Sequence, residues 1–392
     1  MSNTQKKNVP ELRFPEFEGE WEEKQLGEVA KIYDGTHQTP KYTNEGIKFL
    51  SVENIKTLNS SKYISEEAFE KEFKIRPEFG DILMTRIGDI GTPNIVSSNE
   101  KFAYYVSLAL LKTKNLNSYF LKNLILSSSI QNELWRKTLH VAFPKKINKN
   151  EIGKIKINYP KKQEQQKIGQ FFSKLDRQIE LEEQKLELLQ QQKKGYMQKI
   201  FSQELRFKDE NGNDYPDWTN ERLGEVTTVT MGQSPKSVNY TDNSNDTVLI
   251  QGNADIENGL INPRIYTREV TKLIQKDEII LTVRAPVGKL AMAQINACIG
   301  RGVCSIKGDK FLYYFLEWFA TQNKWIRFSQ GSTFESISGN DIRNIHIKIP
   351  VEDERTKIIK LLNSLDVLNS KTDLKIQNLK QRKQSLLQKI FV

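Results

Sequence analysis

Cysteine and histidine are scarce in this sequence. Its 392 residues include two cysteines, Cys298 and Cys304, and three histidines, His37, His140 and His346. Two thiols cannot form a disulfide framework in a chain of this length, which indicates a reducing compartment. The histidines are isolated and no Cys/His spacing matches a zinc site, so we expect no metal site. We expect both cysteines to be small buried hydrophobic residues.

Long apolar runs are also missing. The longest, residues 311–320, is interrupted by Glu317 and is far shorter than the ~20 residues of a membrane span. The first 14 residues contain no apolar segment typical of a secretory signal. Hydrophobic residues still make up 37% of the chain, which is enough to bury a core. These features predict a soluble cytoplasmic protein.

Motifs of catalysis are absent as well. The sequence contains no G-x-x-x-x-G-K-[ST] phosphate loop and no glycine-rich fingerprint or Asn-Pro-Pro-Tyr-type string for S-adenosylmethionine. Acidic pairs such as Glu22-Glu23 have no arrangement that singles out an acid and a base. We therefore expect no catalytic residue and no cofactor in this chain, and we predict a scaffold or recognition protein.

Basic residues are in excess. The chain has 59 Lys and Arg against 49 Asp and Glu, a net charge of +10. This excess favours a polyanionic partner such as nucleic acid, although a merely solvated basic surface is the alternative.

The chain is an internal repeat. Trp21 and the string Leu26–Val29 recur 197 residues later as Trp218 and Leu223–Val226. Towards the end of each half the spacing becomes 190 residues and aligns the following pairs: Trp135 with Trp325, Pro160 with Pro350, Asp176 with Asp366, and Phe201 with Phe391. The string Glu-Leu-Arg-Phe opens both halves, at residues 11–14 and 204–207. Solenoid repeats are far shorter, so we predict two duplicated domains related by a pseudo-two-fold.

Each half begins with a region of mixed α+β character. Segments rich in β-branched residues and bounded by turn residues predict strands at 47–52, 80–86 and 154–159, and again at 246–251, 278–284 and 344–349. Helices are predicted at 119–135 and 311–328.

Each half ends in a long helical segment without proline, at residues 161–201 and 351–392. Apolar residues recur at heptad a and d positions for about five heptads in both segments, which predicts a coiled coil between them. The core of this interface is predicted to contain Ile168, Phe172, Leu175, Ile179, Leu186 and Leu189 with Ile358, Leu362, Leu365, Ile376, Leu379 and Leu386. Separate surface helices are the alternative.

Polar residues interrupt both heptad stripes. They are Glu182, Asn369, Thr372 and the equivalent lysines Lys193 and Lys383. Buried polar positions of this kind cost stability and define register or orientation. Because a globular region precedes each helix, antiparallel packing would keep the two regions apart, whereas parallel packing would make them collide. We therefore predict an antiparallel coiled coil.

With these motifs the sequence resembles the specificity (S) subunit of type I DNA restriction–modification systems, over essentially the whole chain. The resemblance rests on Trp21 with Leu26–Val29, on Gly80–Leu83, and on the tail of each half. The tails run from Ile155 to Asp176 and from Ile345 to Asp366. One departure is an extra stretch, Lys208–Asp214, at the entrance of the second half.

The resemblance implies a fold and a set of partners. The expected domains are a first target-recognition domain at 1–160, a central spacer helix at 161–203, a second target-recognition domain at 204–350 and a C-terminal spacer helix at 351–392. Each recognition domain would recognise one half of a split, asymmetric sequence in double-stranded DNA. The helices would dock two adenine methyltransferase (M) subunits, and restriction (R) subunits would join them. S-adenosylmethionine, ATP and Mg would bind those partners, and the complex would associate with the nucleoid.

Base recognition requires polar side chains on loops that can enter a groove. Three loops in each half meet this requirement, and Arg301 between two glycines is a further candidate. The predicted DNA-binding residues are Thr36, His37, Gln38, Lys41, Arg86, His140 and Lys145 in the first half, and Gln233, Ser234, Lys236, Arg284, Arg301, Ser332 and Thr333 in the second. Plain polar turns are the alternative for the first loops, and a salt-bridged strand-end arginine is the alternative for Arg86 and Arg284. A coiled-coil adaptor that never contacts DNA is the second functional hypothesis.

Overall fold

The computed structural model describes residues 8–113, 115–325 and 336–392, and the chain divides into two compact units. Unit 1 comprises residues 1–183 and 374–392, and unit 2 comprises residues 184–373. Both long helices, α6 (Lys162–Phe201) and α11 (Glu352–Ile390), cross this division. Each unit therefore contains one globular region and a segment of both helices.

Unit 1 is built on a four-stranded antiparallel sheet with the strand order β2-β8-β5-β6. A three-stranded sheet of order β4-β3-β7 packs against it, and β1 pairs with β9. The strands are β1 (Glu22–Gln25), β2 (Ala30–Asp34), β3 (Ile47–Leu50), β4 (Tyr63–Ile64), β5 (Ile82–Ile87), β6 (Asp89–Ile95), β7 (Phe102–Tyr104), β8 (Leu108–Thr113) and β9 (Lys156–Tyr159).

The helices of the globular part of unit 1 are α1 (Leu26–Val29), α2 (Glu66–Glu72), α3 (Ser118–Leu126), α4 (Ser128–Lys137) and α5 (Lys149–Gly153). The prediction of one helix over 119–135 is wrong, because Ser127 has an extended backbone and separates α3 from α4. The side chain of Asn117 begins α3 by accepting the Phe120 N–H at 3.0 Å.

Unit 2 repeats this plan with more strands. Its six-stranded sheet has the order β11-β21-β18-β19-β15-β14, its five-stranded sheet has the order β12-β16-β13-β20-β17, and β10 pairs with β22. The strands are β10 (Thr219–Arg222), β11 (Val229–Met231), β12 (Tyr240–Thr241), β13 (Thr247–Ile250), β14 (Ile256–Glu257), β15 (Leu260–Ile261), β16 (Tyr266–Thr267), β17 (Leu273–Ile274), β18 (Ile279–Thr282), β19 (Leu290–Met292), β20 (Ala297–Ile299), β21 (Val303–Ile306) and β22 (His346–Ile349). The helices are α7 (Leu223–Val226), α8 (Lys310–Thr321) and α10 (Gly339–Arg343).

All six predicted strands exist, with ends within two residues of the predicted ones. The predicted helix over 311–328 is shorter, since α8 ends at Thr321 and its last predicted residues, 326–328, lie outside the described residues.

The central strand of each unit lies between two apolar cores. Ile82 and Met84 of β5 belong to one core of unit 1, whereas Leu83 between them belongs to the other. In unit 2 Ile279 and Ile280 of β18 divide in the same way. Because alternate side chains of a strand point to opposite faces, a strand covered on both faces has a continuous apolar sequence. The duplication therefore extends to the packing.

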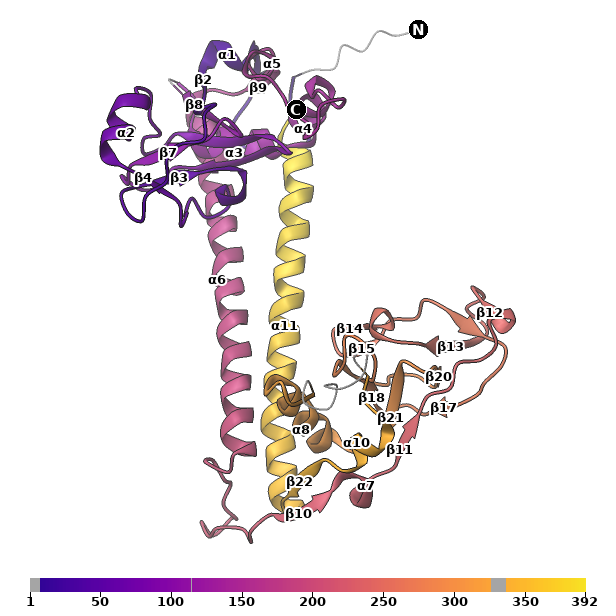
Figure 1. Cartoon of the computed structure of the whole chain (residues 1–392). Helices are drawn as coiled ribbons and strands as arrows, with labels where there is room; N and C mark the ends of the chain where they lie inside the picture. Colours follow the sequence, from indigo (N-terminus) through magenta and orange to yellow (C-terminus); the bar gives the residue numbers. More distant parts are fainter. Residues whose placement is uncertain (1–7, 114, 326–335) are drawn as a thin grey trace. The chain divides into compact units, whose positions relative to one another are not determined.

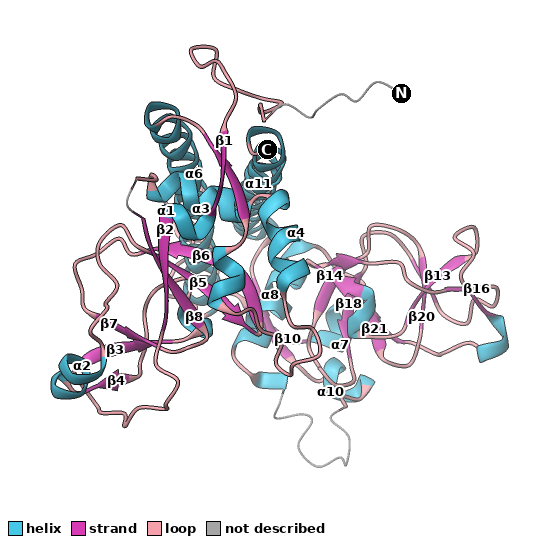
Figure 2. Cartoon of the chain, turned by 90° about the horizontal axis from the view of Figure 1, so that it is seen from above, coloured by secondary structure: helices cyan, strands magenta, loops and turns pink. Residues whose placement is uncertain are grey.

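The two long helices are antiparallel within each unit. In unit 1 Phe172, near the beginning of α6, stacks on Phe391, directly after α11, with ring centroids 5.8 Å apart. Figure 1 shows this yellow end of α11 beside α6, and Figure 2 shows α3 next to both helices. In unit 2 the end of α6, at Ile200, shares a core with the beginning of α11, at Leu362. The predicted antiparallel pairing is confirmed.

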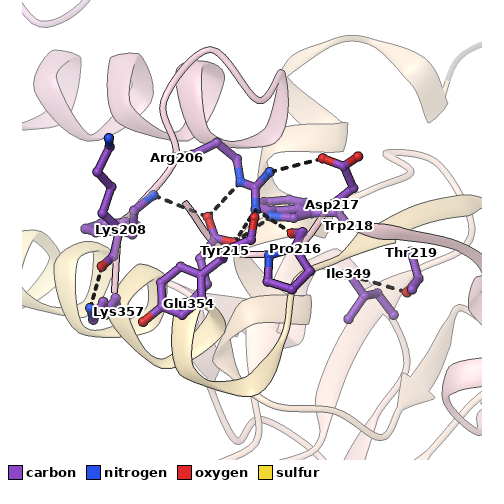
Figure 3. A network of polar contacts seen from close by, with 11 residues as sticks. Arg206, Lys208, Tyr215, Pro216, Asp217, Trp218, Thr219, Ile349, Glu354 and Lys357 are labelled. Carbon is purple, nitrogen blue, oxygen red and sulfur yellow. Dashed lines mark hydrogen bonds and ion pairs between the residues drawn. The ribbon is translucent and has the colours of Figure 1, made fainter. Parts of the chain in front are cut away.

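The repeated Glu-Leu-Arg-Phe string joins each globular region to the first turn of a long helix. Arg13 donates two hydrogen bonds to Glu164 of α6, at 2.8 and 2.7 Å. Arg206 does the same to Glu354 of α11, with both bonds at 2.8 Å (Figure 3). Glu354 also accepts the indole N–H of Trp218 at 2.9 Å. Such forked, charge-assisted pairs have a defined geometry, which explains why the string occurs in both halves.

Candidate nucleic-acid interface

The two units present the same backbone framework at the carboxyl ends of β2 and β5 in unit 1 and of β11 and β18 in unit 2. Glycine follows β2 as Gly35 and follows β11 as Gly232, and a Cβ at either position would collide with a backbone carbonyl. Thr85 and Thr282 are fully buried, and each hydroxyl accepts a backbone N–H at 2.9 Å across the next turn. We call this framework the strand-end frame. It consists of Gly35, Thr85 and Gly91 in unit 1 and of Gly232, Thr282 and Gly288 in unit 2.

Equivalent backbone hydrogen bonds align the loops around the two frames. The N–H of Arg86 donates to the Ser107 carbonyl, and the N–H of Val283 donates to the Gly302 carbonyl, both at 2.9 Å. Arg86 and Val283 therefore occupy equivalent positions, and so do the residues that precede the two acceptors. The predicted first, second and further loops meet at this frame because these bonds join segments far apart in the sequence.

Arg86 of unit 1 is buried, with 5% of its surface exposed. Its guanidinium forms an ion pair with Asp34, the last residue of β2, and Nε donates to the Ile147 carbonyl at 3.0 Å. The structure thus places Arg86 in the second of its two predicted roles, as a salt-bridged strand-end arginine. A guanidinium in this position would be too costly to bury without the Asp34 carboxylate.

The remaining predicted residues of unit 1 lie on two surface segments. His37, Gln38 and Lys41 are exposed on the loop after β2, and Thr36 is half-buried there. These side chains are free to reach a ligand. The first turn of their loop is stabilised by the Thr36 hydroxyl, which accepts the Gln38 N–H at 3.3 Å.

The second segment lies between α4 and α5. His140 is exposed, and its Nε2 lies 2.8 Å from the Trp135 carbonyl. Lys145 is exposed, and its carbonyl accepts the Gly88 N–H at 2.8 Å. The structure therefore brings the predicted second and third loops of unit 1 together at the end of β5.

In unit 2 three predicted residues line one hollow of about 280 Å³. They are Ser234, Arg284 and Arg301, and the Ser234 hydroxyl accepts the Arg301 N–H at 3.1 Å. Both arginine side chains are exposed, and neither forms an ion pair with any residue of unit 2 that the structure describes. The hollow therefore presents two guanidinium groups to solvent.

Three polar side chains that line this hollow are not among the predicted residues. Tyr240, Gln251 and Asn253 line it together with the arginines. The signal for Gln251 was its position at the end of the predicted strand 246–251, because Arg284 stands at the end of another predicted strand, 278–284. Asn253 had no such signal, because it reaches the hollow through η3 (Asn253–Asp255), a short 3-10 helix.

Two predicted residues of unit 2 lie beside the hollow rather than in it. Gln233 and Lys236 are exposed on the same loop as Ser234, and the backbone N–H of Lys236 donates to Glu269 at 3.1 Å. Ser332 and Thr333 lie outside the described residues.

The residues predicted for the coiled-coil interface pack within the chain. In unit 1, Ile168, Phe172, Leu175, Ile179 and Ile376 are buried, and Leu379 and Leu386 are half-buried. In unit 2, Ile358, Leu362 and Leu365 are buried, and Leu186 and Leu189 are half-buried. Because these side chains already pack between helices of the same chain, a partner subunit would contact other residues.

The two lysines of the predicted interface, Lys193 and Lys383, form a repeated ion pair. Lys193 of α6 lies 2.7 Å from Asp366 of α11 in unit 2, and Lys383 of α11 lies 2.6 Å from Asp176 of α6 in unit 1. Unit 2 adds Glu317, whose carboxylate lies 2.7 Å from Lys193. Burial raises the pKa of Glu317, although Lys193 acts in the opposite direction. The same two positions of each helix thus define the antiparallel register in both units.

Both cysteines are buried, as expected. Burial raises the pKa of Cys304 to about 12, so this thiol stays protonated and unreactive at neutral pH. Within residues 8–113, 115–325 and 336–392, no helix has both the length and the apolar composition of a membrane span.

Comparison with known proteins now decides the family. The model of the type I restriction modification DNA specificity domain matches twice, at residues 18–191 and 215–381. This chain belongs to the type I restriction–modification specificity family. Each match contains its own strand-end frame, so the duplication seen in the sequence is a duplication of the specificity domain.

Relatives of known identity are similar over nearly the whole chain. The putative type I restriction enzyme MjaX specificity subunit of Methanocaldococcus jannaschii is 28% identical, over 92% of this chain and 90% of that protein. The MjaVIII specificity subunit of the same organism is 26% identical, over 92% and 89% of the two chains.

Solved structures show the same fold. The type I restriction–modification system S subunit from M. genitalium aligns with a TM-score of 0.63 at 17% identity, over 98% of this chain and 99% of that one. A chain from a study of complex assembly and conformational transition of the type I R-M system aligns with a TM-score of 0.57 at 21% identity, covering 94% and 96%. The predicted resemblance and the predicted fold class are confirmed.

Proposed function

We propose that this specificity subunit recognises a bipartite, asymmetric DNA sequence, with one half-site for each unit, and that it performs no catalysis itself. The observation behind this proposal is the strand-end frame. The same backbone framework occurs twice, and different polar side chains surround it in the two units. A shared framework with different side chains is the arrangement expected of two readers of two different half-sites.

The chemistry of the unit 2 hollow fits base edges. Arginine can donate two hydrogen bonds to O6 and N7 of guanine, and glutamine or asparagine can form a pair of bonds with adenine. Arg284 and Arg301 supply the first kind of group and Gln251 and Asn253 the second. The net charge of +10 supports the phosphate contacts that position a protein on the duplex without specifying sequence.

The long helices supply the spacing and the partner surfaces in this proposal. A helix of 40 residues spans roughly 60 Å at ~1.5 Å per residue. That length is sufficient to separate readers of half-sites about one helical turn, ~34 Å, apart. Large apolar side chains remain exposed on the helices, namely Leu181 and Leu374 in unit 1 and Leu188, Val367 and Leu368 in unit 2.

We assign these exposed side chains to contacts with two adenine methyltransferase subunits, with restriction subunits completing the complex. S-adenosylmethionine, ATP and Mg would bind those partners. The isolated chain is then expected to transfer no methyl group and to cleave no DNA, whereas the assembled complex does both.

A unit exchange tests the bipartite assignment. Residues 21–150 are replaced by the equivalent unit of a relative, the chain is expressed with its methyltransferase partner, and adenine methylation is mapped across a genome. One half-site should change and the other should stay. A change in both half-sites would show that the units are coupled, and unchanged half-sites would show that unit 1 does not read bases.

A point substitution tests the hollow. Arg301→Ala should relax or change the base at one position of the unit 2 half-site, because each forked arginine–guanine contact discriminates by ~1–3 kcal/mol. Arg268→Ala is the matched control, since Arg268 is an exposed arginine of the same unit outside the hollow. An absence of DNA binding by the complex would instead favour a coiled-coil adaptor that never contacts DNA.

A further inference from the structure

The loop between α4 and α5 of unit 1 exposes large apolar side chains at its tip. Phe143 and Val141 are 104% and 98% exposed, and Leu139 is 42% exposed. Phe143 and Val141 contribute no burial to folding, and Leu139 is only partly buried. Single exposed apolar residues are ordinary, but three within five residues form a continuous apolar tip. Such a tip fits a ligand that can cover it.

The base of this loop is rigid. The N–H of Leu139 donates to the Lys146 carbonyl at 2.8 Å, and Ile147 directly after the loop is fully buried. The N–H of Gly88 donates to the Lys145 carbonyl at 2.8 Å, which ties the loop to the end of β5. The apolar tip is therefore displayed from a fixed support, so its ordering costs little entropy on binding.

The charges of the loop select a polyanionic ligand. Residues 134–150 contain five basic residues and no acidic residue. Arg136 and Lys137 have carboxylate partners in Glu133 and Glu151. Lys145 and Lys146 form no ion pair with any residue that the structure describes, and both are exposed.

We propose that this loop inserts Phe143 as an apolar wedge between stacked base pairs of the DNA held by unit 1, while Lys145 and Lys146 bind the flanking phosphates. Proteins that kink duplex DNA insert Phe, Leu, Ile, Met or Pro side chains in this way and stabilise the unstacked step by added contacts. The loop adjoins the strand-end frame through Gly88, so the wedge lies beside the loops assigned to base recognition. The inference rests on the proposed function, since it requires unit 1 to hold duplex DNA.

The test uses the complete chain assembled with its methyltransferase partner. Once the unit 1 half-site is known from the unit exchange, duplexes are made with 2-aminopurine at each position in and beside it. Binding of the unaltered complex should increase the fluorescence at one step away from the adenine that the methyltransferase flips out of the duplex, because unstacking relieves quenching. Phe143→Ala should abolish that increase and weaken binding roughly tenfold to a hundredfold, the range for full burial of a Phe side chain. Phe143→Leu, which stays apolar, should retain part of both effects.

Phe79→Ala is the matched control. Phe79 is 67% exposed and precedes β5, whereas the loop contacts the opposite end of this strand at Ile87. This substitution should leave the fluorescence and the affinity unchanged.

Two results would overturn the wedge while leaving DNA recognition intact. One is specific binding by the unaltered complex without an increase at any step other than the flipped target adenine. The other is a Phe143→Ala complex that binds DNA normally but assembles poorly with its methyltransferase, which would make the tip a protein contact. Failure of the unaltered complex to bind any duplex would refute the proposed function, and the wedge with it.

Discussion

The two units differ in the position of the arginine that lies beside the strand-end frame. Unit 1 has Arg86 on the strand and Val106 on the adjacent loop, whereas unit 2 has Val283 on the strand and Arg301 on the loop. Arg86, Val106 and Val283 are buried, and Arg301 is exposed. The arginine beside the frame is therefore a buried structural residue in unit 1 and an exposed surface residue in unit 2.

The residue before the first glycine of the frame also differs between the two units. Asp34 precedes the glycine of the frame in unit 1 and forms the ion pair with Arg86. Met231 occupies the equivalent position in unit 2 and packs against the core that contains Val283. An ion pair in one copy is thus replaced by two residues of one apolar core in the other, an exchange that proteins tolerate when both positions change together. The frame therefore restricts which residue types can occur together at the buried positions, whereas the exposed positions can vary independently.

The largest predicted effect tests that pairing. Arg86→Val alone should destabilise unit 1 by ~3–5 kcal/mol, because it leaves the Asp34 carboxylate with Lys149, at 3.8 Å, as its remaining cationic partner among the described residues, and because it removes the donor to the Ile147 carbonyl. Combining it with Asp34→Met reproduces the unit 2 pair and should restore most of the loss. Denaturant unfolding of both variants measures this, with hydrogen exchange assigning the change to unit 1. A double variant as unstable as the single one would refute the pairwise account.

The forked arginine–glutamate contacts give the next largest contrast. Glu354→Ala in unit 2 leaves Arg206 and the Trp218 indole N–H without their acceptor, which should cost about 3 kcal/mol. Glu164→Ala in unit 1 affects Arg13 but not Trp21, whose indole N–H has no acceptor among the described residues. Its cost should be about 1–2 kcal/mol. Equal losses in thermal or denaturant unfolding would contradict the ranking.

The lysines between the long helices should also differ. Lys193→Met removes the cation that lies between Glu317 and Asp366, and we expect a cost of about 2–3 kcal/mol. Lys383→Met leaves Asp176 with a second partner, Lys122 at 3.2 Å, and should cost about 1 kcal/mol. The comparison is made on unfolding free energies of the two variants. A larger loss for Lys383→Met would show that the extra carboxylate of unit 2 does not increase its dependence on the lysine.

The smallest predicted effect concerns pH. Burial raises the pKa of Glu317 above 4.5, so its protonated form favours folding. That contribution is present below pH 4.5 and is lost as the pH rises through the raised value in the folded chain. Relative to Glu317→Gln, the unaltered chain should lose less than about 1 kcal/mol between pH 4 and pH 7. The opposite sign in paired denaturation curves would mean that attraction to Lys193 outweighs burial.

Much of the fold could be predicted from patterns that span only a few neighbouring residues. The apolar run around Ile82 predicted β5, and the heptads around Phe172 predicted a paired helix, because both patterns depend on neighbours two to four residues away. Ser127 shows the limit of such patterns. Its extended backbone ends α3 within an apolar helical stretch, and its hydroxyl bonds back to the Leu124 carbonyl at 2.6 Å. A serine can occupy either a helix or its end, so only tertiary packing chose between them.

The candidate site was less predictable than the fold. Turn glycines such as Gly35 and Gly232 located the loops correctly, since close approach to a backbone demands glycine. Gln251 and Asn253 were missed because only the fold brings them into the same hollow as Arg284 and Arg301. The repeat also does not predict burial at every position. Trp135 and Trp325 are aligned in the sequence, but Trp135 is 66% exposed and Trp325 is 4% exposed.

By itself, the sequence determined that this chain is duplicated, that each copy has a mixed α+β region followed by a long helix, and that it belongs with type I specificity subunits. Tertiary structure decided which polar residues are buried and which face solvent. Arg86 is buried because Asp34, 52 residues earlier in the chain, lies opposite it. A periodic pattern reports on neighbours along the chain, whereas the cost of burying a charge depends on a partner that only folding brings into contact.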